Sequence, residues 1–502
     1  MTEADHPVVQ IKPGNVRGFW RGEPGTPGAS AAFLGLPFAQ PPFGELRFAA
    51  PVPPEPWDGV LDCLDYGPTP QRKPFGLVTA IPEPSIQGDS TLNVNVFTPR
   101  PGEPDAALPV MVWIHGGGYT AGSPASPWYD GLAFNRDGVV TVTVSYRLGF
   151  DGFGYIPDAP MNRGVRDWLA ALEWVRDNIA AFGGDPARVT IAGQSAGGAA
   201  VLTLLGMPTA QDLFQGVWCM SGAVGEVPAE RARMLSAKLV ELAGVEFTRV
   251  GLASIPELKL IDLQEKAAAP ESSKPQDVVR SMLQNGLGWA PMIDGDLLTQ
   301  SVLGSIRAGV GADKPLVLGT MDDEVTMALD EARGRMRLIP SGLVLRQFDV
   351  DAATRRAYLA ANKAQRRKGT AAVLGRFITD EVFRAPAVRV AHARGSAPTW
   401  TYRFAWPSPA KGWAFHCLDV PFWWDCLDSE KVDALAGPNP PQQLADADHS
   451  AAVSFVRTGD PGWPSWSAHP GSTRVFDAPS PDGRPVNPQV IPDGYAEVRA
   501  LA

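Results

Sequence analysis

The sequence predicts an α/β fold with a mostly parallel central sheet flanked by helices, and three observations carry that prediction. From Leu108 onward, short apolar runs alternate with helical patterns, as in chains whose parallel strands are joined by crossover helices. The first run, 109–114, is apolar throughout, which is typical of a strand buried on both faces. A serine, Ser195, then lies between a short β-rich run and an alanine- and glycine-rich helical pattern.

The remaining elements follow in chain order. Short β-rich or apolar runs predict strands over 109–114, 139–146, 187–192, 315–320 and 400–406. Between the second and third of these, apolar residues recur every three or four positions and two glycines then follow, which predicts a helix over 164–179.

Later segments are predicted to be mainly helical. Residues 224–300 are rich in Ala, Leu, Glu and Lys, and 346–359 has a helical pattern. We expect one domain over 1–502, because large α/β folds reach this length by insertion, with helical insertions at about 224–300 and 325–395 around an active-site gorge.

Composition and charge exclude several classes of partner. Of the 502 residues, 44% are hydrophobic and 20% charged, which argues against disorder or a coiled coil. The formal net charge of -10 would repel nucleic acid and anionic membrane surfaces. No apolar run approaches the roughly 18 residues of a membrane span, and the acidic N-terminus has no apolar stretch of signal-peptide type. We expect a cytoplasmic protein, a monomer or weak homo-oligomer, with no nucleic-acid or membrane partner.

The cysteines agree with a reducing compartment. Cys63, Cys219, Cys417 and Cys426 form no C-x-x-C pair and no cluster with metal-ligand spacing. We therefore expect free thiols and no metal site.

The surroundings of Ser195 predict a nucleophile. The pattern G-Q-S-A-G (193–197) places the serine on a sharp turn from strand to helix, which requires small neighbours such as Gly193 and Gly197. The N-terminus of the following helix also offers N–H groups and a positive dipole end to a developing oxyanion.

A second glycine-rich segment supplies the other oxyanion donors. H-G-G-G-Y (115–119) directly follows the strand 109–114, and its glycines let backbone N–H groups approach a ligand closely. We predict an oxyanion hole formed by the N–H groups of Gly117, Gly118 and Ala196.

A serine nucleophile needs a histidine base and a carboxylate to orient it. Candidates for the base that follow Ser195 in the chain are His392, His416, His449 and His469. His416 is favoured because it lies in a loop after the strand 400–406 and is bounded by aromatic residues. The candidate acids just after the strand 315–320 are Asp322, Asp323 and Glu324, and spacing does not choose among them.

Several long motifs resemble the type-B carboxylesterases, a family of α/β-hydrolases that includes bacterial p-nitrobenzyl esterases and the cholinesterases. The motifs are F-L-G-L-P-F-A-Q-P-P-F-G-E-L-R-F (33–48), W-I-H-G-G-G-Y (113–119), N-I-A-A-F-G-G-D-P-A-R-V-T-I-A-G-Q-S-A-G (178–197), P-M-I-D-G (291–295) and F-V-R-T-G-D-P-G-W-P-S-W (455–466). The resemblance implies an α/β-hydrolase fold with Ser195 as nucleophile, His416 as base and Glu324 as acid.

The resemblance implies further roles. It places Ser221 behind the triad as a support, and implies structural ion pairs of Arg47 with Asp89 and of Arg147 with Asp167. Four residues would line the substrate pocket: Leu287, Trp289, Met321 and Phe422.

Two departures from the family pattern bear on function. Gln194 stands where many relatives carry glutamate, which removes a charge beside the serine and weakens the case for a cationic substrate. Thr91 stands where secreted relatives have a cysteine, so that family disulfide cannot form.

We therefore expect a serine carboxylesterase that hydrolyses uncharged, hydrophobic esters, of aryl or short-acyl type, through an acyl-enzyme and without a cofactor. One alternative is the same machinery acting on carbamates or amides. Another is a catalytically inactive, cholinesterase-like binding protein, which is disfavoured because all three triad residues are present.

Overall fold

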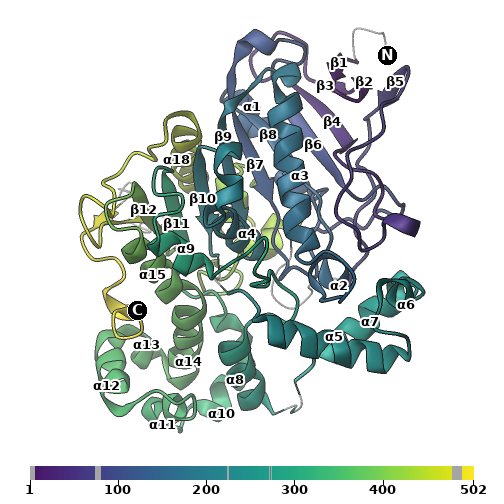
Figure 1. Cartoon of the computed structure of the whole chain (residues 1–502). Coiled ribbons are helices and arrows are strands. Elements are labelled where there is room, and N and C mark those ends of the chain that lie inside the picture. Colours follow the sequence, from purple (N-terminus) through teal and green to yellow (C-terminus); the bar gives the residue numbers. More distant parts are fainter. Residues whose placement is uncertain (1–5, 74–80, 223–224, 271, 273, 478–488) are drawn as a thin grey trace.

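A computed structural model describes residues 6–73, 81–222, 225–270, 272, 274–477 and 489–502 (Figure 1). Its strands are β1 (Val8–Ile11), β2 (Gly14–Arg17), β3 (Phe19–Arg21), β4 (Ser30–Pro37), β5 (Val60–Asp62), β6 (Asn93–Thr98), β7 (Leu108–Ile114), β8 (Val140–Val144), β9 (Gly184–Gln194), β10 (Gly216–Met220), β11 (Leu316–Met321), β12 (Thr399–Phe404), β13 (Thr473–Phe476) and β14 (Gln489–Ile491).

An 11-stranded sheet forms the centre of the molecule, in the order β14-β13-β12-β11-β10-β9-β7-β8-β6-β4-β3. The strands from β8 to β13 in this order run parallel, whereas β14 and the strands from β6 to β3 join antiparallel. A small separate sheet, β1-β2-β5, lies at the N-terminal end. The mostly parallel sheet predicted from the sequence is thus confirmed.

Strand β7 shows why the apolar runs become central strands. It pairs with β8 on one side and β9 on the other, and its residues from Pro109 to Ile114 are buried. A strand covered on both faces needs apolar side chains in both alternating sets, which the run 109–114 provides.

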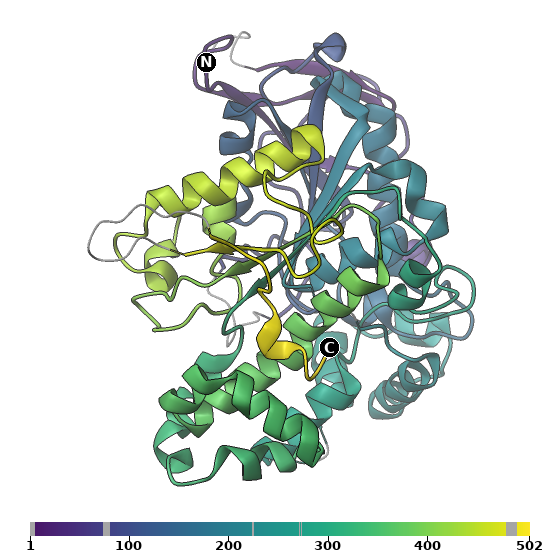
Figure 2. The ribbon, with the colours of Figure 1, turned by 90° about the vertical axis from the view of Figure 1, so that its left-hand side faces the viewer.

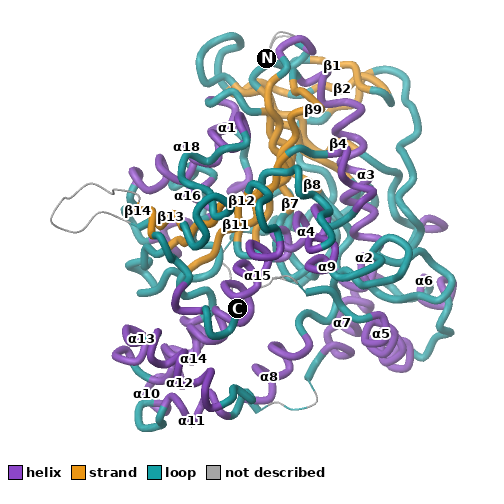
Figure 3. The backbone as a smooth tube through the Cα atoms, turned by 60° about the vertical axis from the view of Figure 1, so that its left-hand side comes forward, coloured by secondary structure: helices purple, strands orange, loops and turns teal. Residues whose placement is uncertain are grey.

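The helices cover both faces of the sheet, with α3 on one side and α18 on the other (Figures 2 and 3). Their bounds are α1 (Leu132–Arg136), α2 (Gly149–Phe153), α3 (Arg163–Asn178), α4 (Ala196–Leu205), α5 (Ala229–Ala243), α6 (Arg249–Ala253), α7 (Glu257–Ala268), α8 (Pro275–Asn285), α9 (Val302–Arg307), α10 (Arg333–Met336), α11 (Ser341–Arg346), α12 (Ala352–Ala361), α13 (Lys363–Lys368), α14 (Thr370–Thr379), α15 (Ala385–Ala393), α16 (Val420–Trp423), α17 (Val432–Ala436) and α18 (Gln442–Thr458).

The two predicted insertions are mainly helical, containing α5 to α8 and α10 to α15, although residues 224, 271 and 273 of the first lie outside the described residues. Helices α10 to α14 gather at one end of the molecule (Figure 1) around a small apolar cluster of their own, which includes Tyr358 and Phe377. The segment 346–359, predicted to be helical, is mainly helical but contains a break between two helices. Helix α11 ends at Arg346 and α12 begins after Asp351, whose carboxylate accepts the N–H groups of Ala353 and Thr354 and so caps a new helix.

One of the two predicted ion pairs forms. Arg147 and Asp167 make a buried pair with a distance of 2.6 Å. Arg47 instead pairs with Asp151 at 3.4 Å and donates to the carbonyl of Ile255, so within the described residues its partner is not Asp89. None of the helices in the described ranges combines the length and apolar character needed to cross a bilayer.

Candidate active site

Ser195 stands on a strained turn between β9 and α4. Its backbone has φ 58° and ψ -122°, a conformation that costs a residue with a side chain on the order of 1–3 kcal/mol. Two backbone hydrogen bonds hold it: its N–H donates to the carbonyl of Met220 at the end of β10 (2.8 Å), and its carbonyl accepts from Ala199 (2.9 Å). A Cβ added to Gly197 would overlap the carbonyl oxygen of Ile114, which explains why only glycine fits there.

The segment after β7 lies beside this serine. Gly117 has φ 107° and Gly118 φ 59°, both in the region that favours glycine. Within the described part of the chain, no hydrogen-bond acceptor is found for either N–H group. Ala196 is the first residue of α4, so its N–H has no acceptor inside the helix. Among the described residues, the N–H groups of all three predicted oxyanion donors therefore have no hydrogen-bond acceptor.

His416 and Glu324 are in direct contact. The Nδ1–H of His416 donates to Oε2 of Glu324 over 2.6 Å, and Oε1 of Glu324 accepts the N–H of Met321 at 2.9 Å. The backbone N–H of His416 also donates to the carbonyl of Glu324. Burial disfavours the imidazolium, but Cys417 and Glu324 favour it, and the pKa of His416 is raised above its usual value.

The three consecutive acids after β11 have three different partners. Asp322 binds Arg403 on β12 at 2.8 Å, and Asp323 binds Arg376 on α14 at 3.2 Å. Glu324 alone of the three contacts the histidine. The sequence pattern did not choose among the three carboxylates, and contact with His416 distinguishes Glu324 from the two aspartates.

Gln194, the residue before the serine, contacts the other nitrogen of the same ring. Its Nε2 lies 3.2 Å from Nε2 of His416, and its side chain is buried. Between Ser195 and His416 no hydrogen bond forms among the described residues. No sequence pattern indicates this contact, because it joins residues 222 positions apart.

A small cavity adjoins Ser195. Its volume is about 10 Å³, room for roughly one water molecule. It is lined by Gly116, Gly117, Gly122, Gln194 and Ser195, together with Ile81, Glu83, Tyr129 and Cys417, which the sequence analysis did not single out. The four predicted pocket residues do not line it: Leu287 is exposed, and Trp289, Met321 and Phe422 are buried in the core.

The other candidate residues lie elsewhere. Ser221 follows β10 directly and is fully buried, with no hydrogen-bond partner for its Oγ among the described residues. His449 contacts Asp137 and the carbonyl of Trp423, and His392 packs against Trp466. Burial, opposed by a hydrogen bond to Gly116 and assisted by the charge of Arg72, lowers the pKa of His115 to about 3.

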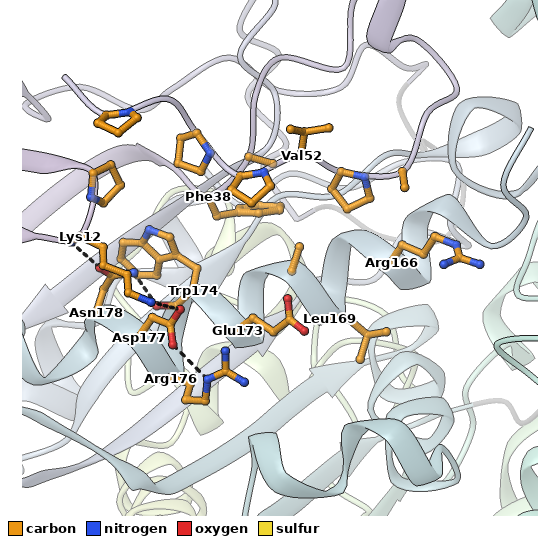
Figure 4. Close-up of a pocket in the computed structure, with 18 residues that line it drawn as sticks. Lys12, Phe38, Val52, Arg166, Leu169, Glu173, Trp174, Arg176, Asp177 and Asn178 are labelled. Carbon is orange, nitrogen blue, oxygen red and sulfur yellow. Dashed lines mark hydrogen bonds and ion pairs between the residues drawn. The ribbon is translucent and has the colours of Figure 1, made fainter.

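A larger groove of about 520 Å³ lies apart from these residues (Figure 4). Proline rings of the 50–56 loop form one wall, and Leu169, Glu173 and Trp174 of α3 form the other. Since no member of the candidate triad lines this groove, its size does not mark it as the reaction site.

Comparisons with known proteins show which family the chain resembles over most of its length. Residues 5–476 match the carboxylesterase family. Para-nitrobenzyl esterase of Bacillus subtilis (strain 168) is 33% identical over 490 residues, which span 94% of this chain and 95% of that protein. Fumonisin B1 esterase of Sphingopyxis macrogoltabida is 29% identical over 463 residues, or 89% and 80% of the two chains. A solved carboxylesterase of Geobacillus stearothermophilus superposes with a TM-score of 0.78 at 30% identity, covering 94% and 96%.

The chain has the α/β-hydrolase fold, and the predicted fold class is confirmed. It belongs to the carboxylesterase family and is a carboxylic ester hydrolase of the para-nitrobenzyl esterase type.

Proposed function

We propose that this enzyme is a serine carboxylesterase that uses Ser195, His416 and Glu324 to hydrolyse uncharged, hydrophobic esters through an acyl-enzyme. The observation that carries the proposal is the 2.6 Å contact of His416 Nδ1 with Glu324. It fixes the tautomer in which Nε2 keeps its lone pair on the side of the strained serine turn.

Two steps follow from these roles. Ser195 Oγ attacks the ester carbonyl while His416 Nε2 takes the hydroxyl proton, and the imidazolium then protonates the departing alkoxide. Water then attacks the acyl-enzyme carbonyl while His416 Nε2 takes its proton. The imidazolium returns this proton to Ser195 Oγ as the acyl–Oγ bond breaks and the carboxylic acid is released. The N–H groups of Gly117, Gly118 and Ala196 receive the oxyanion in both steps. Ser221 is proposed to support the triad from behind.

The cavity lining supports the choice of substrate. Ile81, Tyr129, Cys417 and glycine backbone surround Ser195, and the one lining carboxylate, Glu83, has a counter-charge in Arg72 at 3.8 Å. Such a lining favours uncharged aryl or short-acyl esters, and the para-nitrobenzyl esterase relative is named for a benzylic ester, whose alcohol carries an aromatic ring. Small-molecule esters are the proposed partners, and the four free cysteines agree with a cytoplasmic location.

Covalent labelling tests the mechanism. A fluorophosphonate probe should label the parent enzyme at Ser195, and Ser195→Ala should lose both the label and ester turnover by about 10⁴- to 10⁶-fold. Ser450→Ala, which changes an exposed serine on α18, is the matched control and should behave as the parent. Labelling of Ser195→Ala, or an unlabelled parent as expected of a binding protein, would refute the proposal.

A panel of p-nitrophenyl esters tests the substrate class. Acetate and butyrate should give a higher kcat/KM than palmitate, because Ile81, Tyr129 and Cys417 lie close around Ser195 and limit the length of the acyl chain that fits. Equal or better turnover of palmitate would overturn the short-acyl assignment.

A further inference from the structure

The catalytic histidine has a neighbour on each ring nitrogen. Nδ1 donates to Glu324, so Nε2 of the neutral ring is an acceptor, and the side-chain amide of Gln194 donates to it over 3.2 Å. This is the lone pair that the proposed mechanism uses to take the proton of Ser195. In the structure, the amide of Gln194 therefore holds the position that the serine hydroxyl must take during catalysis.

The side chain of Gln194 is confined where it stands. Gln194 is the last residue of β9, in register with Met220 of β10, and is 1% exposed. A Cβ on Gly116 would come within 3.0 Å of its Oε1, so the amide lies directly against the oxyanion segment. The buried amide thus lies between Gly116 and the base in the resting enzyme, and it must move off Nε2 when the hydroxyl of Ser195 takes its place.

We propose that Gln194 is a positioning residue that holds Nε2 of His416 in the resting enzyme and, because its amide is uncharged, keeps the base neutral at a lower pH than a carboxylate there would. The inference rests on the proposed role of His416 as general base. A donor to the lone pair stabilises the neutral imidazole, whereas a carboxylate at the same place would stabilise the imidazolium. The residue that separates this chain from many relatives would then set the pH range of its activity.

Other groups that titrate or carry charge also face His416. Glu324 binds Nδ1, Cys417 is the next residue in the chain, and the charge of Asp419 lies close enough to interact. Glu83 lines the small cavity beside Ser195 and Gln194. These groups are unchanged in variants of position 194. Differences among such variants therefore report the contact with Gln194.

The pH dependence of kcat/KM for p-nitrophenyl acetate tests the proposal on the full-length enzyme. In Gln194→Glu the acidic limb should move to higher pH by about 1 unit or more, because an opposite charge at this distance raises a base pKa by that much. In Gln194→Met, which has a similar volume and neither donor nor charge, the limb should lie between those of parent and Gln194→Glu. Variants with lower turnover at every pH but an unmoved limb would show a purely structural role and overturn the proposal.

A second measurement does not depend on turnover. NMR titration of the His416 ring, assigned by comparison with His416→Gln, should give the same order of pKa values: parent, then Gln194→Met, then Gln194→Glu. If the parent is active and labelled but the His416 ring has the same pKa in the parent and in both variants, this inference is overturned and the proposed function stands. A parent with no turnover and no label, but with shifted titrations, would refute the proposed function and leave the contact itself established.

Discussion

The two sides of the active site are held by different kinds of interaction. On the nucleophile side, backbone sets the geometry: Ser195 is fixed by hydrogen bonds to strand and helix, and Gly197 lets α4 pack against the end of β7. On the acid–base side, charged side chains set it: Glu324 binds His416 between the pairs that Asp322 and Asp323 make with their arginines. The nucleophile side should therefore be sensitive to added volume, and the acid–base side to lost charge.

The acid–base side also contacts the helices α10 to α14, which gather at one end of the molecule. Arg376 on α14 reaches back to Asp323 at the end of β11, and the backbone N–H of Asp323 donates to Ala414 in the segment that carries His416. One ion pair thus connects α14, the acid and the base. Variants that remove one type of support at a time test the difference between the nucleophile side and the acid–base side.

The largest effect is expected from Glu324→Gln. The amide keeps the shape of the side chain but can donate to Nδ1, which stabilises the wrong histidine tautomer, so kcat should fall by about 10⁴-fold. Asp322→Asn makes the same chemical change two residues away, where the partner is Arg403, and should cost stability with far less loss of kcat. Equal losses of kcat in both variants would mean that contact with His416 is not what distinguishes Glu324.

Arg376→Met should destabilise the protein by about 3–5 kcal/mol, since it leaves Asp323 buried without its counter-charge. Urea unfolding measures this, and kcat should fall as well because Asp323 supports the base segment. Lys12→Met breaks the exposed pair with Asp177 and should cost at most about 1 kcal/mol. Similar costs for the two variants would contradict a special role for the buried pair.

Matched glycine substitutions test the nucleophile side. Gly197→Ala forces α4 away from Ile114, and misplacement of the serine by about 1 Å should lower kcat by roughly 10²-fold. Gly334→Ala in α10 meets nothing within 4 Å and should stabilise that helix by about 0.5–1 kcal/mol without loss of kcat. An active Gly197→Ala enzyme would show that backbone packing does not fix the serine.

The difference between backbone geometry and side-chain partners also explains what the sequence could predict. The strand 109–114, the helix 164–179 and the glycines around Ser195 are local patterns, and the structure shows them as β7, α3 and the turn into α4 within one or two residues. Backbone geometry is encoded near the residues that adopt it. The break within the helical segment 346–359 is also local, since the carboxylate of Asp351 caps the start of α12.

Side-chain partners are not encoded locally. Nothing near Asp322, Asp323 and Glu324 shows that their partners lie 81, 53 and 92 residues further along the chain. The lining of the cavity is not encoded locally either, because Ile81, Tyr129 and Cys417 meet at Ser195 only after the chain has folded. Resemblance to a family could choose the acid, whereas physical spacing alone could not.

A further expected effect is on the pH dependence of stability and concerns the buried carboxyl of Asp419. Burial, assisted by the charge of Glu324, raises the pKa of Asp419 to about 7, and the hydroxyl of Tyr402 donates to its Oδ2. An unfolded aspartate titrates near pKa ~3.9, so the protonated carboxyl contributes stability that is fully present below about pH 4 and is lost as pH rises to about 7. Asp419→Asn cannot titrate and should escape this loss, which is about 4 kcal/mol for a pKa raised from ~3.9 to about 7.

Urea unfolding of parent and Asp419→Asn at several values between pH 4 and pH 8 measures the difference. The parent should lose stability relative to the variant between pH 4 and 7 and run parallel to it above that range. Parallel behaviour throughout would mean that Asp419 is ionised in the folded protein despite its burial beside Glu324. The acid–base side would then hold two neighbouring ionised carboxylates, Glu324 and Asp419.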